Sequence, residues 1–307
     1  MSIGKFLSPK NDLAFKRIFG TEKNKDILIH FLNDIFGHTT NPIEHVTFLK
    51  TSQEPEVAAQ RVSVVDILCE DLEKNKFIIE MQVTPEKGFE RRAQYYAAKT
   101  YIEQRTKDVL YQDLKAVTFL AITEFTLFPN KNAYLSHHHM MDQETHERDL
   151  KDFSFSFLEL PKFKKSKDDL ITMTEKWAYF FKHAAETEER DLDEITGDDF
   201  IIKRAYEELN RYSWSVEELR TYDGVDLKRW SDQGVKDYAF DKGMEEGLEK
   251  GMEKGMEKGI EQGLEKGEEI GTHKTKYNIA RAMKKMGITV NKIVEATELT
   301  QEEVNNL

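Results

Sequence analysis

The sequence holds little that could crosslink the chain or anchor it in a membrane. Its 307 residues include one cysteine, Cys69, so no disulfide can form within the chain. No apolar run reaches the roughly 18 residues that a membrane-spanning helix needs, and the first residues lack the apolar stretch of a signal peptide. We therefore expect a cytosolic protein that folds in a reducing compartment without contacting a membrane.

The motifs of several enzyme classes are also missing. The sequence has no P-loop, no Gly-x-Ser-x-Gly and no Rossmann glycine fingerprint. A histidine run is present at His137, His138 and His139, but three consecutive strand residues cannot all face one way. No cysteine or histidine lies at zinc-finger spacing. We interpret this run as strand surface without an assigned function.

Charge is abundant but unevenly distributed. Charged residues make up 33% of the chain and the net charge is −12, which disfavours nucleic acid because phosphate contacts need Lys and Arg. Residues 1–30 and 86–107 nevertheless each hold six Lys or Arg against three Asp or Glu. A local basic field can attract a polyanion, so DNA remains a candidate partner.

Up to about residue 225 the sequence has the pattern of one mixed α/β domain. Segments rich in Val, Ile and aromatic residues predict strands at 61–70, 76–83, 114–122, 134–141 and 153–160. Apolar residues at helical spacing predict helices at 11–19, 21–36, 86–107, 166–185 and 200–212. Ser8 is the expected cap of the first helix, with Pro9 at its first position, and Gly37 is expected to end the second.

A glycine repeat follows this domain. From residue 243 to residue 271 every fourth residue is glycine, and each repeat is close to Gly-Met-Glu-Lys. Each glycine costs a helix about 1 kcal/mol relative to alanine, so we expect the segment, alone in water, to be only marginally helical. A polar spacer and a self-association segment both fit, the second because glycines four apart let a partner helix approach closely. The repeat 243–271 is therefore a candidate for homo-oligomer formation.

The last 35 residues regain a folded pattern. Residues 273–307 predict three short helices, one ending at Gly287, one capped by Thr289 and one opened by the capping box of Thr300 and Glu303. This arrangement resembles a helix-turn-helix. DNA contact and a plain interaction module both remain open for this tail.

Two acidic residues on adjacent predicted strands are candidate metal ligands. Glu80 and Gln82 face the same side of their strand, and a hairpin centred on residue 73 places Asp66 opposite Glu80, with Cβ atoms roughly 4.5–5.5 Å apart. Carboxylates that close repel unless a cation lies between them, and Mg²⁺ prefers such oxygen ligands. Charged residues at a strand end are the alternative. An unpaired Asp within the apolar segment 64–68 is costly, which favours the metal site.

The predicted helix that follows the hairpin is basic on one side. It carries Arg91, Arg92, Tyr95 and Lys99 close together at helical spacing. Such a face can follow DNA phosphates, with the tyrosine stacking or hydrogen bonding between them. A solvated basic surface above core tyrosines is the alternative interpretation.

These segments together resemble a known family. Val65-Asp66-Ile67 followed by Ile79-Glu80-Met81-Gln82 resembles the core of PD-(D/E)XK nucleases, with Gln in place of the usual Lys. Residues 10–20, residues 89–101 and the Gly-x-Glu-x repeats are similar to the Rpn recombination-promoting nuclease/putative transposase family. The resemblance implies an α/β, restriction-endonuclease-like core with a mixed central sheet flanked by helices, over residues 1–225. A glycine-repeat segment (226–272) and a small helical tail (273–307) complete the expected organisation.

The same resemblance implies the roles of individual residues. Asp66 and Glu80 would bind Mg²⁺ or Mn²⁺, with the backbone carbonyl of Met81 as a further ligand. Gln82 takes the place of the water-positioning lysine of the family. Asp12 is a candidate auxiliary acid, although a solvated first-turn Asp that favours the helix dipole explains it equally well.

The function implied by the resemblance is a metal-dependent DNA endonuclease. It would hydrolyse phosphodiester bonds with low sequence specificity, because no segment other than the tail resembles a base-reading element, and it would promote DNA recombination. The alternative is a protein whose nuclease core has decayed and which only binds DNA or oligomerises.

Overall fold

The computed structural model describes residues 4–38, 40, 42–53, 63–105 and 108–307. The chain divides into two compact units, Met1–Arg229 and Trp230–Leu307. The boundary falls inside one helix, α7 (Val216–Lys285). Each unit has its own hydrophobic core.

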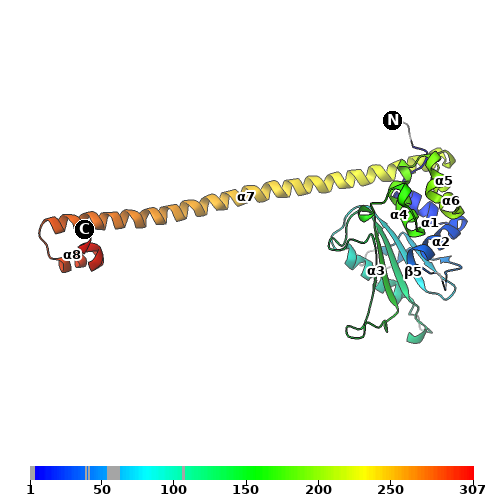
Figure 1. Ribbon diagram of the computed structural model, residues 1–307, viewed down its shortest axis with the longest axis horizontal. Helices are drawn as coiled ribbons and strands as arrows, with labels where there is room; N and C mark the ends of the chain where they lie inside the picture. Colours follow the sequence, from blue (N-terminus) through cyan, green and yellow to red (C-terminus); the bar gives the residue numbers. More distant parts are fainter. Residues whose placement is uncertain (1–3, 39, 41, 54–62, 106–107) are drawn as a thin grey trace. The chain divides into compact units, whose positions relative to one another are not determined.

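A mixed six-stranded sheet organises the first unit (Figure 1). Its strand order is β1-β4-β5-β6-β8-β7: β5, β6 and β8 run parallel, while the remaining neighbours are antiparallel. The strands are β1 (Thr47–Phe48), β4 (Ile67–Glu70), β5 (Lys76–Gln82), β6 (Val117–Thr123), β7 (Leu135–His139) and β8 (Phe153–Glu159). A separate pair joins β2 (Ser52–Gln53) to β3 (Ser63–Val64).

Helices cover both faces of this sheet. One face packs against an aromatic-rich layer formed by α1 (Asp12–Phe19), α2 (Lys25–Phe36), α4 (Met173–His183) and α6 (Phe200–Glu208). The opposite face packs against α3 (Phe89–Glu103). The short helix α5 (Leu192–Thr196) precedes α6. This is the restriction-endonuclease-like α/β architecture that the sequence predicted.

The central strand β5 is buried on both faces, which explains its continuous apolar run. Ile79 and Met81 belong to the core under α1 and α2, whereas Ile78 belongs to the core under α3. Because side chains alternate along a strand, Glu80 and Gln82 lie on the α3 side. A strand that is covered on both faces leaves such an acidic residue little access to bulk water.

Several predicted boundaries were wrong for local reasons. Asn11, not Ser8, caps α1, because its side chain accepts a hydrogen bond from the Leu13 amide. Helix α3 begins later than residue 86 because Gly88, with φ +83°, turns the chain before it. Residues 166–172 precede α4, which starts at the capping box of Thr172. The predicted strand 61–70 breaks at Asp66, and its residues 61 and 62 lie outside the described chain.

The second unit contains the glycine repeat. The structure places the whole repeat in α7, where the sequence predicted only marginal helix. Glu, Lys, Met and Leu between the glycines are strong helix formers, and a helix already nucleated on both sides only has to propagate. A Cβ added to any glycine from 243 to 271 would meet nothing within 4 Å in the described chain.

A small helical core closes the chain. The end of α7, α8 (Val290–Thr297) and α9 (Gln301–Asn305) pack around Ala280, Ile293 and Val304. Thr300 and Glu303 form the predicted capping box. Across the described residues, no helix combines the length and apolarity that crossing a bilayer requires.

Candidate active site

Asp66 and Glu80 lie opposite each other at the end of the β4–β5 hairpin. The pairing of Ile67 with Ile79 gives the hairpin the predicted register. Asp66 lies at a bend one residue before β4, outside the backbone hydrogen bonds that pair β4 with β5. Its Oδ2 accepts a hydrogen bond of 2.9 Å from the Met81 amide. The side chain of Asp66 is thereby held next to the backbone of β5.

Glu80 is a buried acid with an incomplete set of partners. The residue is 4% exposed, and its Oε1 has no hydrogen-bond partner in the part of the chain that the structure describes. The Arg92 guanidinium lies 3.6 Å from Oε2. Burial raises the pKa of Glu80 and repulsion by Asp66 raises it further, while Arg92 opposes the shift. A cation close to this buried carboxylate would stabilise its ionised form.

Asp66 shows the same tendency for related reasons. Burial raises the pKa of its carboxyl. The Met81 amide and Lys16 oppose that rise, and the negative charge of Asp12 adds to it. Nearby positive charge therefore stabilises the ionised form of both carboxyls.

Helix α1 brings a third acid and a lysine to this pair. The Lys16 ammonium lies 2.9 Å and 3.1 Å from the two Asp12 oxygens and 3.8 Å from Asp66 Oδ1. Partial burial lowers the pKa of Lys16, but Asp12, Asp66 and Glu80 together raise it above its ordinary value. Asp12 thus lies beside Asp66, as an auxiliary acid would, and Lys16 connects the two. No pattern in the sequence predicted this position for Lys16.

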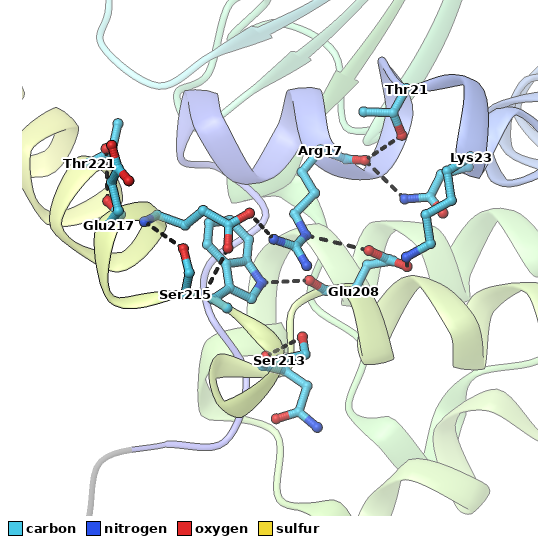
Figure 2. A network of polar contacts seen from close by, with 12 residues as sticks. Arg17, Thr21, Lys23, Glu208, Ser213, Ser215, Glu217 and Thr221 are labelled. Atoms are coloured by element: carbon cyan, nitrogen blue, oxygen red, sulfur yellow. Dashed lines mark hydrogen bonds and ion pairs between the residues drawn. The ribbon is translucent and has the colours of Figure 1, made fainter.

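The position of α1 is fixed from its other side. Arg17 bonds to Glu208, the last residue of α6 (Figure 2), and to Glu218 in α7, 2.7 Å away. Its guanidinium also lies 4.4 Å from the centre of the Trp214 ring. At the helix start, the Asn11 amide donates to the Tyr222 carbonyl. These bonds hold α1 so that Asp12 and Lys16 face the acid pair.

Gln82 lies on the same face as Glu80, and both ends of its amide are occupied. Its Oε1 accepts a 2.8 Å bond from Arg92, and its Nε2 donates to the Thr84 carbonyl at 2.9 Å. Arg92 also bonds to Glu86. Gln82 therefore orients Arg92 toward Glu80 in this structure.

The four predicted DNA-binding residues are divided between two sides of α3. Arg91 and Tyr95 face outward, and Tyr95 is 56% exposed. Arg92 turns toward Glu80 and Gln82, which separates it from Arg91. Lys99 is half-buried and takes part in an interaction of its own.

The donors present suit a divalent cation only with help from other ligands. Among the described residues, no group of three or more His, Cys, Asp or Glu side chains is arranged to hold a metal. Two carboxylates remain, with the Met81 carbonyl, which points to the Asp66 side because its own amide bonds there. Mg²⁺ usually keeps several waters and binds substrate phosphate besides one or two carboxylates. The unpartnered Glu80 oxygen fits that mode.

The histidine run lies away from this site. His137 and His139 line a cavity of about 640 Å³ at the hairpin end of the sheet, whereas His138 packs against Phe128 on the other side. His137 bonds to the Ser156 hydroxyl at 2.8 Å. Burial lowers the pKa of all three rings. The alternating directions agree with the strand interpretation of the run.

Fold and acid pair together define the class of PD-(D/E)XK nuclease-like proteins. The chain belongs to the PD-(D/E)XK nuclease family transposases, whose family model matches residues 9–239. Comparison with curated proteins and with solved structures found no match. Membership supports a hydrolase of the nuclease class, a group of enzymes that typically uses divalent metal ions.

Proposed function

We propose that this protein is a DNA endonuclease that hydrolyses phosphodiester bonds with Mg²⁺ or Mn²⁺ held by Asp66, Glu80 and the Met81 carbonyl. The observation that carries the proposal is the buried Glu80 carboxylate, which faces Asp66 with one oxygen left without a partner in the described chain. Without a cation, the pKa values of both carboxyls are raised, so binding a cation between them is electrostatically favourable.

The chain's own residues prepare the site for hydrolysis. A bound divalent cation would supply charge neutralisation at a phosphate oxygen and acidify a water molecule. The Met81 amide fixes the Asp66 carboxylate, and Gln82 fixes Arg92 beside Glu80. Asp12 lies next to Asp66 as an auxiliary acid that can accept a proton from the attacking water.

DNA is the proposed substrate, bound along α3. Arg91 and Tyr95 offer charge and a stacking surface to the backbone, and Lys99 and Arg92 extend the basic surface toward the acid pair. Phosphate contacts carry little sequence information, so we expect low specificity. The family's transposase description supports a role in DNA recombination, and the single cysteine supports a cytosolic location.

The exposed apolar residues of α7 support self-association with a second copy of the chain. Met252 and Met256 belong to a series of apolar side chains that are 55–70% exposed, namely Met244, Leu248, Met252, Met256, Ile260 and Leu264. The adjacent glycines leave space for close approach. Light scattering should show an oligomer, and the full-length double variant Met252→Glu with Met256→Glu should shift it toward monomer. An unchanged mass for that variant would argue against this interface.

Plasmid nicking tests the proposed activity. The purified chain should convert supercoiled plasmid to open circles with Mg²⁺ or Mn²⁺ and not with EDTA. Asp66→Ala should abolish nicking while circular dichroism and melting temperature show a folded protein. A wild-type protein that binds DNA but does not nick it with either metal would support a decayed core that binds DNA or oligomerises. Nicking by Asp66→Ala at the wild-type rate would mean that the site is misassigned.

A further inference from the structure

The active site lacks the lysine that PD-(D/E)XK nucleases in general carry on the strand. Gln82 occupies that position and brings no charge, and its amide is already bonded to Arg92 and Thr84. Phosphodiester hydrolysis places growing negative charge on the phosphate oxygens, and a fixed cation nearby stabilises that charge. Any side-chain cation that acts beside the metal therefore has to come from a residue other than Gln82.

Lys16 is placed where such a cation is needed. Its ammonium lies 3.8 Å from Asp66 Oδ1 and within 3.1 Å of both Asp12 oxygens. The side chain is 41% exposed, so the ammonium can exchange a carboxylate for a substrate phosphate. The Phe15 and Phe19 side chains beside it are fully buried, and the Arg17 bonds shown in Figure 2 keep α1 in place. Lys16 is therefore held at the site by the fold.

Arg92 is the other cation near the acid pair, and it is less available. Its guanidinium bonds to Gln82 and Glu86 and lies 3.6 Å from Glu80. It also lies over the rings of Phe89 and Tyr96. Several partners would have to be released before it could contact a phosphate.

We propose that Lys16, on α1, is the catalytic cation of this site and takes over the role of the lysine that Gln82 replaces. The assignment rests on the proposed nuclease function. The ammonium donates hydrogen bonds to a non-bridging oxygen of the scissile phosphate. Water oxygen bonds to phosphorus, the bond from phosphorus to the leaving oxygen breaks, the water gives a proton to the Asp12 carboxylate, and the leaving oxygen takes one from solvent. Lys16 remains protonated throughout.

A merely structural lysine and a catalytic one predict different metal affinities. In the absence of DNA, the positive charge of Lys16 repels a divalent cation bound at Asp66 and Glu80. Lys16→Gln should therefore bind Mn²⁺ about fivefold more tightly than the wild type and yet cleave roughly 100-fold more slowly. If Lys16 only held Asp66 in place, both affinity and cleavage would fall.

Moving the lysine back to the strand gives a rescue test. Lys16→Arg should keep partial activity, and the double variant Lys16→Gln with Gln82→Lys should recover cleavage. Lys23→Gln is the matched control, because Lys23 also forms an ion pair but with Glu208, at the far end of α1 (Figure 2). It should leave cleavage and Mn²⁺ affinity unchanged.

The decisive experiment measures plasmid nicking and Mn²⁺ titration calorimetry on these full-length variants. Slower cleavage with tighter Mn²⁺ binding in Lys16→Gln, and recovery in the double variant, support the assignment. Wild-type cleavage by Lys16→Gln, weaker Mn²⁺ binding, or no recovery would overturn it while leaving the nuclease function intact. A wild-type protein inactive with both metals would instead overturn the function, and the assignment with it.

Discussion

Two glutamates are buried in the same sheet in opposite electrostatic situations. Glu159, at the end of β8, is 0% exposed. Its Oε1 accepts backbone hydrogen bonds of 2.6 Å and 3.0 Å from Leu127 and Phe128, and its Oε2 accepts one of 2.6 Å from Lys162. Every oxygen of this carboxylate is satisfied inside the chain.

Glu80, two strands away in β5, is left incomplete. Its Oε1 has no partner in the described structure, and its nearest neighbour across the hairpin is another acid, Asp66. A fold that pairs Glu159 so fully is able to pair a buried acid when the acid serves stability. This difference supports the proposal that a divalent cation completes the coordination of Glu80.

Removing the charge of Glu80 should have the largest effect on cleavage. Glu80→Gln keeps the shape of the side chain but removes the negative charge that would hold the cation. Cleavage should fall by roughly 1000-fold or more. Metal-free stability above pH 8, where Glu80 is ionised, should not decrease, because a repulsive charge has been removed. Plasmid nicking and thermal melting measure the two quantities. Loss of the fold in Glu80→Gln would show that the residue is structural.

The matching change at Glu159 should have the reverse outcome. Glu159→Gln leaves Lys162, which is 9% exposed, without its counter-ion. Removing one partner of a buried ion pair typically costs about 3–5 kcal/mol of unfolding free energy. Urea unfolding should show that loss, while nicking per folded molecule stays at the wild-type level. Replacing both partners, as in Glu159→Leu with Lys162→Met, should cost less than the single change.

The pH dependence of metal-free stability reports on the protonation of Glu80. The pKa of Glu80 is raised from its ordinary value of 4.5 to about 8, so the folded state holds this proton more tightly than the unfolded state. Stability should therefore decrease as pH rises from 4.5 to about 8, by more than about 1 kcal/mol. Denaturant unfolding of the wild type and Glu80→Gln isolates this contribution. Equal pH dependence in both proteins would contradict the assigned shift.

The smallest expected effect concerns the outward face of α3. Arg91→Ala should weaken DNA binding modestly and equally for different sequences, and reduce the slope of log affinity against log salt by about 1. Fluorescence anisotropy at several salt concentrations measures both. Cleavage at saturating DNA should be unchanged, because Arg91 does not contact the acid pair. A sequence-dependent loss of affinity would point to base contacts instead.

Much of the fold could be predicted from local patterns. The Val- and Ile-rich segments and their turn gave the hairpin centre at residue 73, which the pairing of Ile67 with Ile79 confirms. Alternation placed Glu80 and Gln82 on one face, where the structure has them. These features depend on residues within about 20 positions of one another, and sequence periodicity reports such distances well.

The features that could not be predicted from the sequence depend on long-range packing. Lys16 reaches Asp66 across 50 residues of chain, and the i,i+4 spacing of Asp12 and Lys16 looks like an ordinary helix-surface ion pair. The order of β5, β6 and β8 is likewise set by crossovers. Arg92 could not be assigned a direction, because only the position of α3 decides whether it faces DNA or Glu80. Side-chain direction in these cases follows from tertiary structure, which one sequence does not show.

Binding of Mn²⁺ to the full-length protein in the absence of DNA shows whether Asp66 and Glu80 hold a divalent cation. Titration calorimetry should detect binding to the wild type and to folded Glu159→Gln at similar affinity, and none to Glu80→Gln. Binding of Mn²⁺ to Glu80→Gln with the wild-type affinity would contradict the account, because the ion would then lie away from the acid pair.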